Sequence, residues 1–142
     1  MAVEQLAVET VEFNGTRYAE IIWAQTEVDQ TTFFSPAKSS FQFGLLAHQA
    51  GFVEPPHFHA PFQRTVDDLQ QMFVVQRGVV EIQLYNDDGD LLREIVMRAG
   101  DAIVLIHGVH AIRVIEDMQC ITVKQGPFLG PDKDKIFVEA NS

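Results

Sequence analysis

Two histidines stand one residue apart, as His57-Phe58-His59, directly after Pro55-Pro56. The prolines disfavour helix at this point and favour extended chain. In an extended segment residues i and i+2 project from the same face, so we expect both imidazoles to point the same way. Two convergent neutral imidazoles favour binding of zinc, iron, nickel, copper or manganese. A surface or turn pair is the alternative interpretation of so short a motif.

Three further side chains are candidates for chemistry. Arg64 follows the histidine pair by a few residues, and its guanidinium is a candidate substrate contact that would hold a carboxylate or phosphate. A salt bridge with Asp67 or Asp68 is the alternative. We expect His107, at the end of an apolar run, to be a hydrogen-bonded wall residue, the alternative being a partner that orients a ligand imidazole. We expect His48 to be structural.

Several other chemistries are not indicated. The chain has no glycine-rich phosphate loop and no nucleophile elbow. Cys120 is the only cysteine, so an internal disulfide is excluded, and its apolar surroundings predict a buried, unreactive thiol in a reducing compartment. The formal net charge of −10 opposes binding to nucleic acid or to an anionic membrane. An anionic small molecule stays compatible with this charge, because a cationic pocket can lie within an acidic surface.

The elements expected to position these residues are short strands separated by glycine and proline turns. The clearest hairpin joins Val79–Tyr85 to Leu91–Met97 through a turn that contains Gly89. In Met72–Val75 and Ala102–Ile106 the residues of both strand faces are apolar, which predicts central strands covered on both faces. Further strands are expected at Tyr18–Ala24, Phe41–Gln49, Ala111–Ile115 and Gln119–Lys124. About eight strands indicate a closed or nearly closed all-β barrel.

The 142 residues, 46% of them hydrophobic, have the size of a single domain with a real core. We expect an N-terminal arm at residues 1–30, a barrel core at about residues 40–125 and a C-terminal tail at residues 126–142. No apolar run approaches the roughly 20 residues that cross a bilayer, and the start lacks the pattern of a secretion signal, so we expect a soluble cytoplasmic protein. The arms, with Trp23, predict a homodimer, or else they cover the same barrel.

Gly51-x5-His57-x-His59, followed by Gln71-x6-Gly78, resembles the first motif of the cupin superfamily, G-x5-H-x-H-x3,4-E-x6-G. Gly100-Asp101, an apolar strand and then Gly108-Val109-His110 are similar to the second motif, in which a histidine after a glycine turn supplies the last metal ligand. The resemblance spans about residues 51–112. It implies the cupin double-stranded β-helix, a barrel of jelly-roll type in one domain.

Carried over by position, the resemblance implies that His57, His59 and His110 bind a metal and that Gln71 occupies the position usually held by glutamate. Three features depart from the family pattern: eleven residues, 60–70, precede Gln71; Ile106 replaces the usual proline; and one residue separates Gly108 from His110. The alternative for Gln71 is a buried amide bonded to backbone. An amide in place of glutamate leaves the charge of the metal unneutralised and favours an anionic ligand.

The resemblance implies one divalent transition metal, Fe, Ni, Mn or Zn, in an enzyme that acts on a small anionic molecule. Among cupins a dioxygenase is the commonest such enzyme, with isomerases and lyases next. A metal-free ketoisomerase or epimerase of the sugar-nucleotide type is one alternative; it needs an acid such as Tyr18 or Tyr85. A binding module without catalysis is the other alternative.

Overall fold

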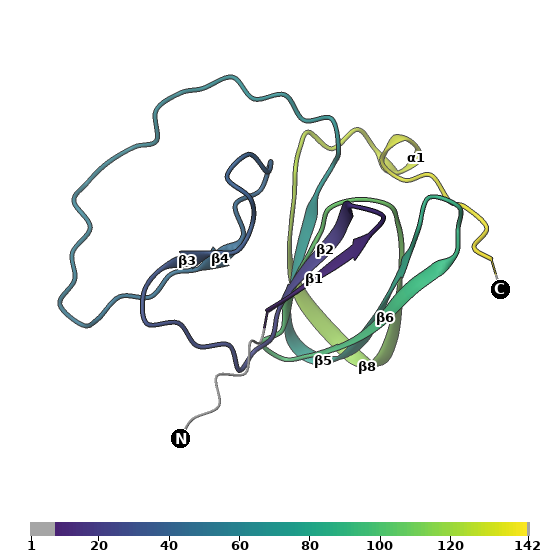
Figure 1. The fold of residues 1–142 in the computed structure, drawn as a ribbon, viewed down its shortest axis with the longest axis horizontal. Helices are drawn as coiled ribbons and strands as arrows, with labels where there is room; N and C mark the ends of the chain where they lie inside the picture. The colour runs from purple at the N-terminus through teal and green to yellow at the C-terminus, as the bar shows by residue number, and fades with distance from the viewer. Residues whose placement is uncertain (1–7, 142) are drawn as a thin grey trace.

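Six antiparallel strands form one sheet that curls around an apolar core (Figure 1). The computed structural model describes residues 8–141. The sheet contains β1 (Val8–Phe13), β2 (Thr16–Ile22), β5 (Gln71–Tyr85), β6 (Leu91–Arg98), β7 (Ala102–Leu105) and β8 (Val109–Lys124). β3 (Thr32–Phe33) and β4 (Gly44–Leu45) form a second, small sheet, and α1 (Pro131–Asp134) is a single helical turn. The all-β prediction is confirmed, in the form of a half-barrel.

The strand order is β1-β2-β7-β5-β6, and β8 pairs with the other edge of β5. β7 pairs with the first half of β5, where Phe73 lies opposite Ile103, and β6 pairs with the second half, where Ile82 lies opposite Ile95. The two segments with apolar residues on both strand faces therefore lie in the middle of the sheet, as predicted. Strands with apolar residues on both faces need cover on both faces, and only central positions supply it.

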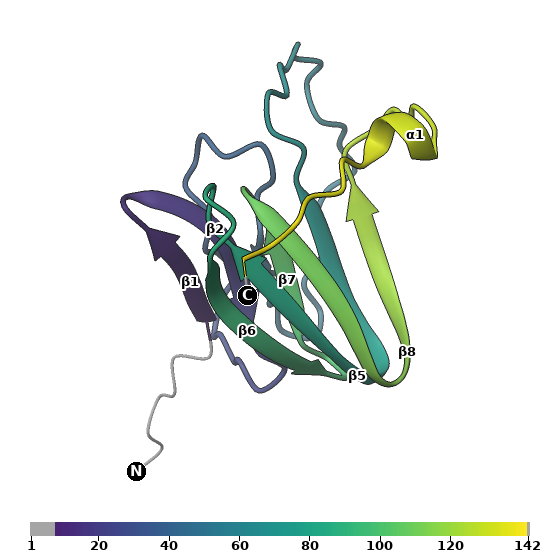
Figure 2. The same ribbon diagram turned by 90° about the vertical axis from the view of Figure 1, so that its right-hand side faces the viewer.

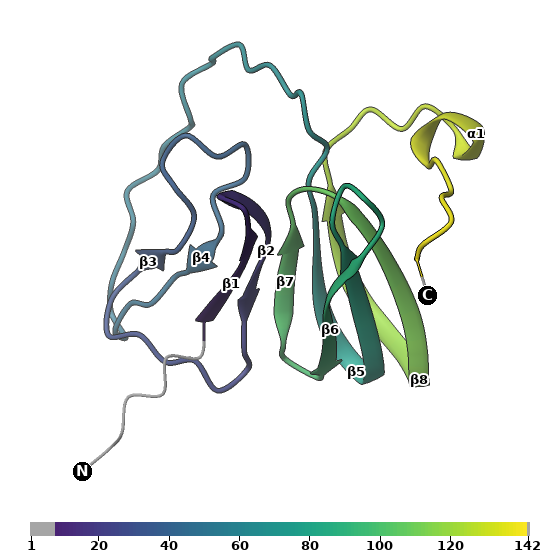
Figure 3. The same cartoon turned by 45° about the vertical axis from the view of Figure 1, so that its right-hand side comes forward.

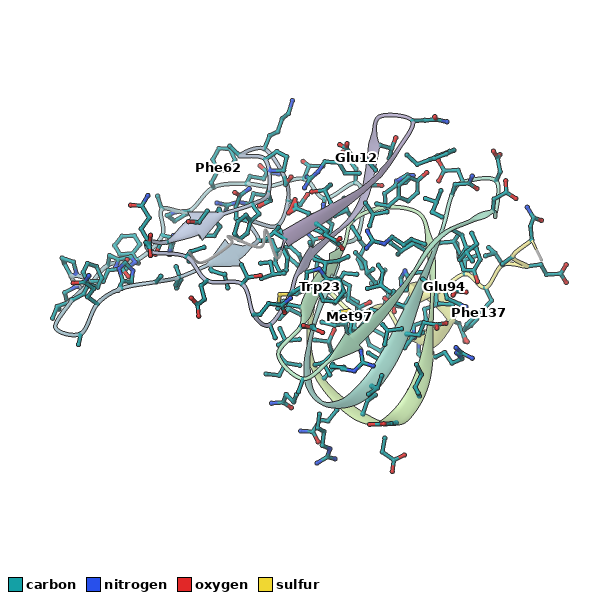
Figure 4. The ribbon with its side chains drawn as sticks, turned by 60° about the horizontal axis from the view of Figure 1, so that its bottom comes forward. Glu12, Trp23, Phe62, Glu94, Met97 and Phe137 are labelled. Carbon is teal, nitrogen blue, oxygen red and sulfur yellow. The ribbon has the colours of Figure 1, made fainter. Side chains whose placement is uncertain are left out.

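The core fills the inside of the curl. Its buried members come from β1, β2, β5, β6 and β7, and Met97 is fully buried among them (Figure 4). The two ends of the curl approach each other at β1 and β6, where the Arg93 guanidinium donates to the Glu9 carboxylate over 2.6 Å (Figure 2). The same carboxylate accepts a hydrogen bond from Trp23 Nε1. Trp23 thus covers its own barrel, which is the second of the two uses considered for it.

Residues 8–22 belong to the sheet itself. Ala19 and Ile21 are fully buried in the core, and β2 pairs with β7. The segment expected as an arm added to the barrel thus supplies two of its strands from residue 8 onward; residues 1–7 lie outside the described part. The predicted strand Phe41–Gln49 is reduced to β4, because side chains replace the sheet ladder: Ser35 Oγ accepts from Phe43 N, and Thr31 Oγ1 accepts from Ala47 N.

The longest pair of strands, β5 and β8, is sharply bent. Register shifts fall between Val75 and Val80, around Gly78. Gly78 has a φ of +85°, and a Cβ there would lie 2.1 Å from the Asp117 carbonyl oxygen. Only glycine permits this close approach, and bulges of this kind increase bending and twist. Four short strands were predicted here, and the structure joins them into two continuous bent strands. Met72–Val75 and Val79–Tyr85 both belong to β5, and Ala111–Ile115 and Gln119–Lys124 both belong to β8.

Residues 46–69, the histidine segment, have no strand or helix and run away from the half-barrel alongside β3 and β4 (Figure 1). β8 lies at the outer edge of the large sheet (Figure 3), and among residues 8–141 its second edge has no strand partner. Within this range no helix is long and apolar enough to span a membrane.

Candidate functional site

Gln71 and His110 line the same space at the open end of the curled sheet. Two adjoining cavities of about 250 and about 280 Å³ share four lining residues, namely Leu69, Gln71, Gly108 and His110. Two of the four sequence-predicted metal ligands are therefore brought together by the fold. Cavities of this kind, concave and with a few convergent polar groups, are the usual form of small-molecule sites.

The register of β8 on β5 puts His110 on the core-facing side of β8, where its side chain stays exposed at the mouth of the cavity. His110 lies opposite Leu84, which is fully buried in the core, and residues directly opposite in an antiparallel pair project from the same face. The preceding turn depends on Gly108, whose φ is +83°. A Cβ at this position would lie 2.7 Å from the ring of Tyr18, so a larger residue would push the turn and His110 out of place.

The environment of His110 keeps its imidazole neutral. Burial lowers the pKa of His110 below its ordinary value, and the positive charge of Lys135 lowers it further. A neutral imidazole has an unprotonated ring nitrogen, which is the form that binds a metal or accepts a proton. His110 is therefore suited to act as a ligand or as a general base at neutral pH.

The amide of Gln71 is oriented by a neighbouring strand. Its Nε2 donates to Thr122 Oγ1 on β8 over 3.0 Å. This bond uses the nitrogen end of the amide, so the oxygen is the end left to accept from a ligand or to bind a cation. Gln71 is half-buried and bonded to a side chain, which differs from the alternative of a buried amide bonded to backbone.

The C-terminal tail forms one wall of the site, which sequence reasoning missed. Lys135, Ile136 and Phe137 line the cavity of about 250 Å³ beside His110, and α1 is held there by a 2.9 Å ion pair between Lys124 and Asp134. The sequence signal was the run Lys133-Asp134-Lys135 followed by apolar residues in a polar tail. Asp134 offsets the charge of Lys124, so Lys135 is the cation that suits this wall to an anionic group.

His57 and His59 form a second group, on the histidine segment. Their ring centroids are 5.4 Å apart. His57 Nδ1 donates to the Pro55 carbonyl over 2.8 Å, and Glu54 Oε1 lies 3.3 Å from Nε2 of the same ring. A ring N–H held by a backbone carbonyl is the usual arrangement of a metal-binding histidine. The two imidazoles are thus close to each other, with their ring planes 69° apart.

The two groups are not brought together within one chain. Phe62 on the histidine segment and Phe137 at the His110 cavity lie on opposite sides of the molecule (Figure 4). Among the described residues no three histidine, cysteine, aspartate or glutamate side chains gather closely enough to hold a metal ion. One chain therefore presents two separate groups, His57 with His59 and His110 with Gln71, which are called the two candidate half-sites below.

Comparisons with protein-family models, curated proteins and solved structures gave no match to this chain. The resemblance to cupins therefore depends on the motif residues alone.

Arg64 lies away from both half-sites. Its guanidinium donates to the Phe62 carbonyl and lies 5.4 Å from the centre of that ring, in a separate cavity that Lys38 also lines. Neither Asp67 nor Asp68 forms a described ion pair with it, so the structure gives the alternative use for Arg64 no support.

The other singled-out residues have structural partners. His107 is bonded to Asp87 over 2.9 Å and packs edge-on against Tyr18, as a wall histidine would. His48 is stacked on Phe52. Cys120 is half-buried, and burial raises the pKa of its thiol, which agrees with the predicted unreactive cysteine.

Proposed function

We propose that this protein is a cupin that binds one divalent transition metal, Fe, Ni, Mn or Zn, through His57, His59, His110 and Gln71, and acts on a small anionic molecule. The observation that supports it most is that His110, whose pKa is lowered, and Gln71, whose amide nitrogen is already bonded to Thr122, line one cavity. Imidazole nitrogen and amide oxygen together suit these ions. The single cysteine fits a protein of the cytoplasm.

The anionic character of the substrate is supported by the cavity wall. Lys124 and Lys135 line the cavity beside His110, while the only acid among its lining residues, Asp134, is already paired with Lys124. Lys135 thus brings the charge that a carboxylate or enolate would meet. A dioxygenase-like reaction is proposed first, with isomerase and lyase reactions next, because these follow from the resemblance.

Metal analysis tests the proposal directly. Protein purified without a histidine tag is expected to carry a first-row transition metal when measured by inductively coupled plasma mass spectrometry, and His110→Ala is expected to lose it. His48→Ala is the matched control, because His48 stacks on Phe52 away from the cavity. Metal content that is absent from the wild type, or equal in both variants, would contradict the proposal. Oxygen uptake with diketones, thiols and aromatic diols then tests the reaction.

A metal-free base is the second candidate, and one observation favours it. His110 is the one imidazole with a pKa lowered among the described residues, and it shares its cavity with a lysine, as a general base acting next to a carbonyl would require. The acid partner is missing from the cavity, because Tyr18 is buried against His107 and the Tyr85 hydroxyl donates to Gln83. Activity that survives chelation would favour this candidate.

A further inference from the structure

A third cavity, of about 380 Å³, lies between the histidine segment and the loop that joins β3 to β4. Its volume is in the range of small-molecule sites, roughly 300–1,000 Å³. Three parts of the chain line it, namely residues 37–40, residues 62–66 and Gln125. It shares no lining residue with the two cavities at His110, so the metal proposed above makes no use of it.

The charged side chains of this cavity are both cations. Lys38 and Arg64 line it, no acid within residues 8–141 does, and neither cation forms an ion pair in the described part of the chain. The whole chain has 20 acidic residues against 10 lysines and arginines, so this grouping runs against its composition. Arg64 donates to the Phe62 carbonyl with one nitrogen and keeps further N–H donors for another acceptor. Two uncompensated cations in one cavity attract an anion.

Gln125 adds a donor whose orientation is fixed. One end of its amide accepts from the Gln70 N–H over 2.8 Å. Because a backbone N–H only donates, this end is the oxygen, and Nε2 is the end left to donate. Within residues 8–141 this Nε2 has no hydrogen-bond acceptor, and Gln125 is half-buried at the cavity.

The loop between β3 and β4 contributes backbone donors. Gln42 Nε2 donates to three carbonyls of the loop, over 3.1, 3.2 and 3.0 Å: those of Pro36, Ala37 and Ser39. These peptides are trans, and in a trans peptide the N–H points opposite to the C=O, so the N–H groups that follow point away from Gln42. They belong to Ala37, Lys38 and Ser40, which line the cavity, whereas Gln42 does not. None of the three has an acceptor among the described residues, and free N–H groups of this kind bind anions.

We propose that this cavity, called the Lys38–Arg64 site, binds the phosphate group of a small organic phosphate monoester. Such a phosphate carries a charge of about −1.5 to −2 at pH 7 and three acceptor oxygens. The charge matches the two cations, and the three oxygens accept from Lys38, Arg64 and Gln125 together. A carboxylate has a single charge and two oxygens, so it would leave one cation uncompensated.

The organic part of the ligand is held in the rest of the cavity. A phosphate group fills only part of the volume, and Phe62 and Val66 supply apolar lining. The Lys38–Arg64 site therefore favours a phosphate ester over free inorganic phosphate. Its occupation is independent of the metal proposed for the cavities at His110.

The first experiment follows the ¹⁵N–¹H NMR spectrum during titration with phenyl phosphate at about pH 7.5, where the ester is mostly a dianion. Saturable shifts are expected at the backbone amides of Ala37, Lys38 and Ser40 and at the side-chain amide of Gln125. Benzoate is the matched carboxylate, and inorganic phosphate is the matched anion without an organic part; both are expected to bind more weakly. Shifts confined to residues outside the cavity, or benzoate or inorganic phosphate bound as tightly as the ester, overturn the proposal.

Charge variants test the two cations. Arg64→Gln and Lys38→Gln are each expected to weaken phenyl phosphate binding about tenfold or more, because each removes a charge-assisted hydrogen bond. Arg98→Gln is the matched control: it removes the same charge from the end of β6, outside the cavity, and should bind as the wild type does. Equal affinity in the control and in both cavity variants contradicts the proposal.

Gln125→Glu tests the geometry of the site. Glutamate keeps an oxygen for the Gln70 N–H but replaces the Nε2 donor by a negatively charged acceptor, so phenyl phosphate binding should be lost. Urea denaturation checks that the fold is retained. His110→Ala removes a proposed metal ligand and is expected to leave phenyl phosphate binding unchanged. Wild-type affinity in Gln125→Glu, or lost affinity in His110→Ala, would place the phosphate elsewhere and overturn the proposal.

Discussion

Gln71 and His110 line one cavity although they lie at opposite ends of the β5–β8 pair, where Gln71 is opposite Lys124 and His110 is opposite Leu84. Along a straight strand these positions would be separated by roughly 40 Å, at about 3.3 Å per residue. The bend around Gly78 removes that separation. The glycine that ends the first motif thus brings together residues from both motifs.

Gly78→Ala is expected to destabilise the fold severely. The new Cβ would meet the Asp117 carbonyl oxygen at 2.1 Å, and backbone on both strands must move, so we expect a loss of ~3 kcal/mol or more in the free energy of unfolding. Gly15→Ala is the matched control, because its φ of +77° is similar but nothing lies within 4 Å. It should lose only about 1 kcal/mol. Urea denaturation measures both, and equal losses would show that φ alone matters at Gly78.

The sequence was sufficient for most strands of the large sheet, but not for the arrangement of the residues that it singled out. Apolar residues on both strand faces predicted β5 and β7 as central strands, because a strand that is buried on both faces has apolar residues at consecutive positions. The bend at Gly78, in contrast, arises from contact with Asp117 across the sheet, which no local pattern reports. The cavity wall formed by Lys135 and its neighbours was missed for the same reason, because the position of the C-terminal tail depends on tertiary contacts that no local pattern reports.

Asp101, taken from the sequence only as part of a motif, clamps the turn before β7. Its Oδ1 accepts from Ala24 N and its Oδ2 from Arg98 N, both over 2.8 Å, and it is buried. Asp101→Ala removes both charged hydrogen bonds, each worth ~1.5–3 kcal/mol, so we expect a loss of about 3 kcal/mol or more in the free energy of unfolding.

Asp101→Asn keeps one acceptor oxygen but places its NH₂ group against the other backbone N–H. Its loss in the free energy of unfolding should therefore be equal to that of Asp101→Ala or somewhat smaller. Thermal and urea denaturation compare the two. Unfolding free energies within experimental error of the wild type for both variants would remove Asp101 from the determinants of the turn.

Gln71→Glu is expected to tighten metal binding, because a carboxylate brings the negative charge that an amide lacks. Isothermal titration of wild type and variant with Zn²⁺ measures it. Thr122→Val is the companion variant: it frees the amide from its 3.0 Å bond, so the oxygen is less well oriented and affinity should fall modestly. Affinity that is unchanged or weaker in Gln71→Glu would remove Gln71 from the ligands.

Removing Lys135 should raise the pKa of His110 only part of the way toward its ordinary value, because burial is the larger cause of the lowering and remains. NMR titration of the His110 ring in Lys135→Ala measures the shift. Lys133→Ala, two residues earlier, is the control for loss of a positive charge. A return of the pKa to its ordinary value in Lys135→Ala would reverse the order of the two causes.

The same lowering makes stability depend on pH. Because the folded protein resists protonation of His110, the unfolded chain binds more protons just below the ordinary histidine pKa, so the free energy of unfolding should fall as pH drops through that value and stay flat above it. In His110→Gln this part of the pH dependence should disappear. Urea denaturation at about pH 7.5 and about pH 5.5 compares the two proteins. Equal pH dependence in both would mean that His110 is protonated as readily in the folded protein as in the unfolded chain.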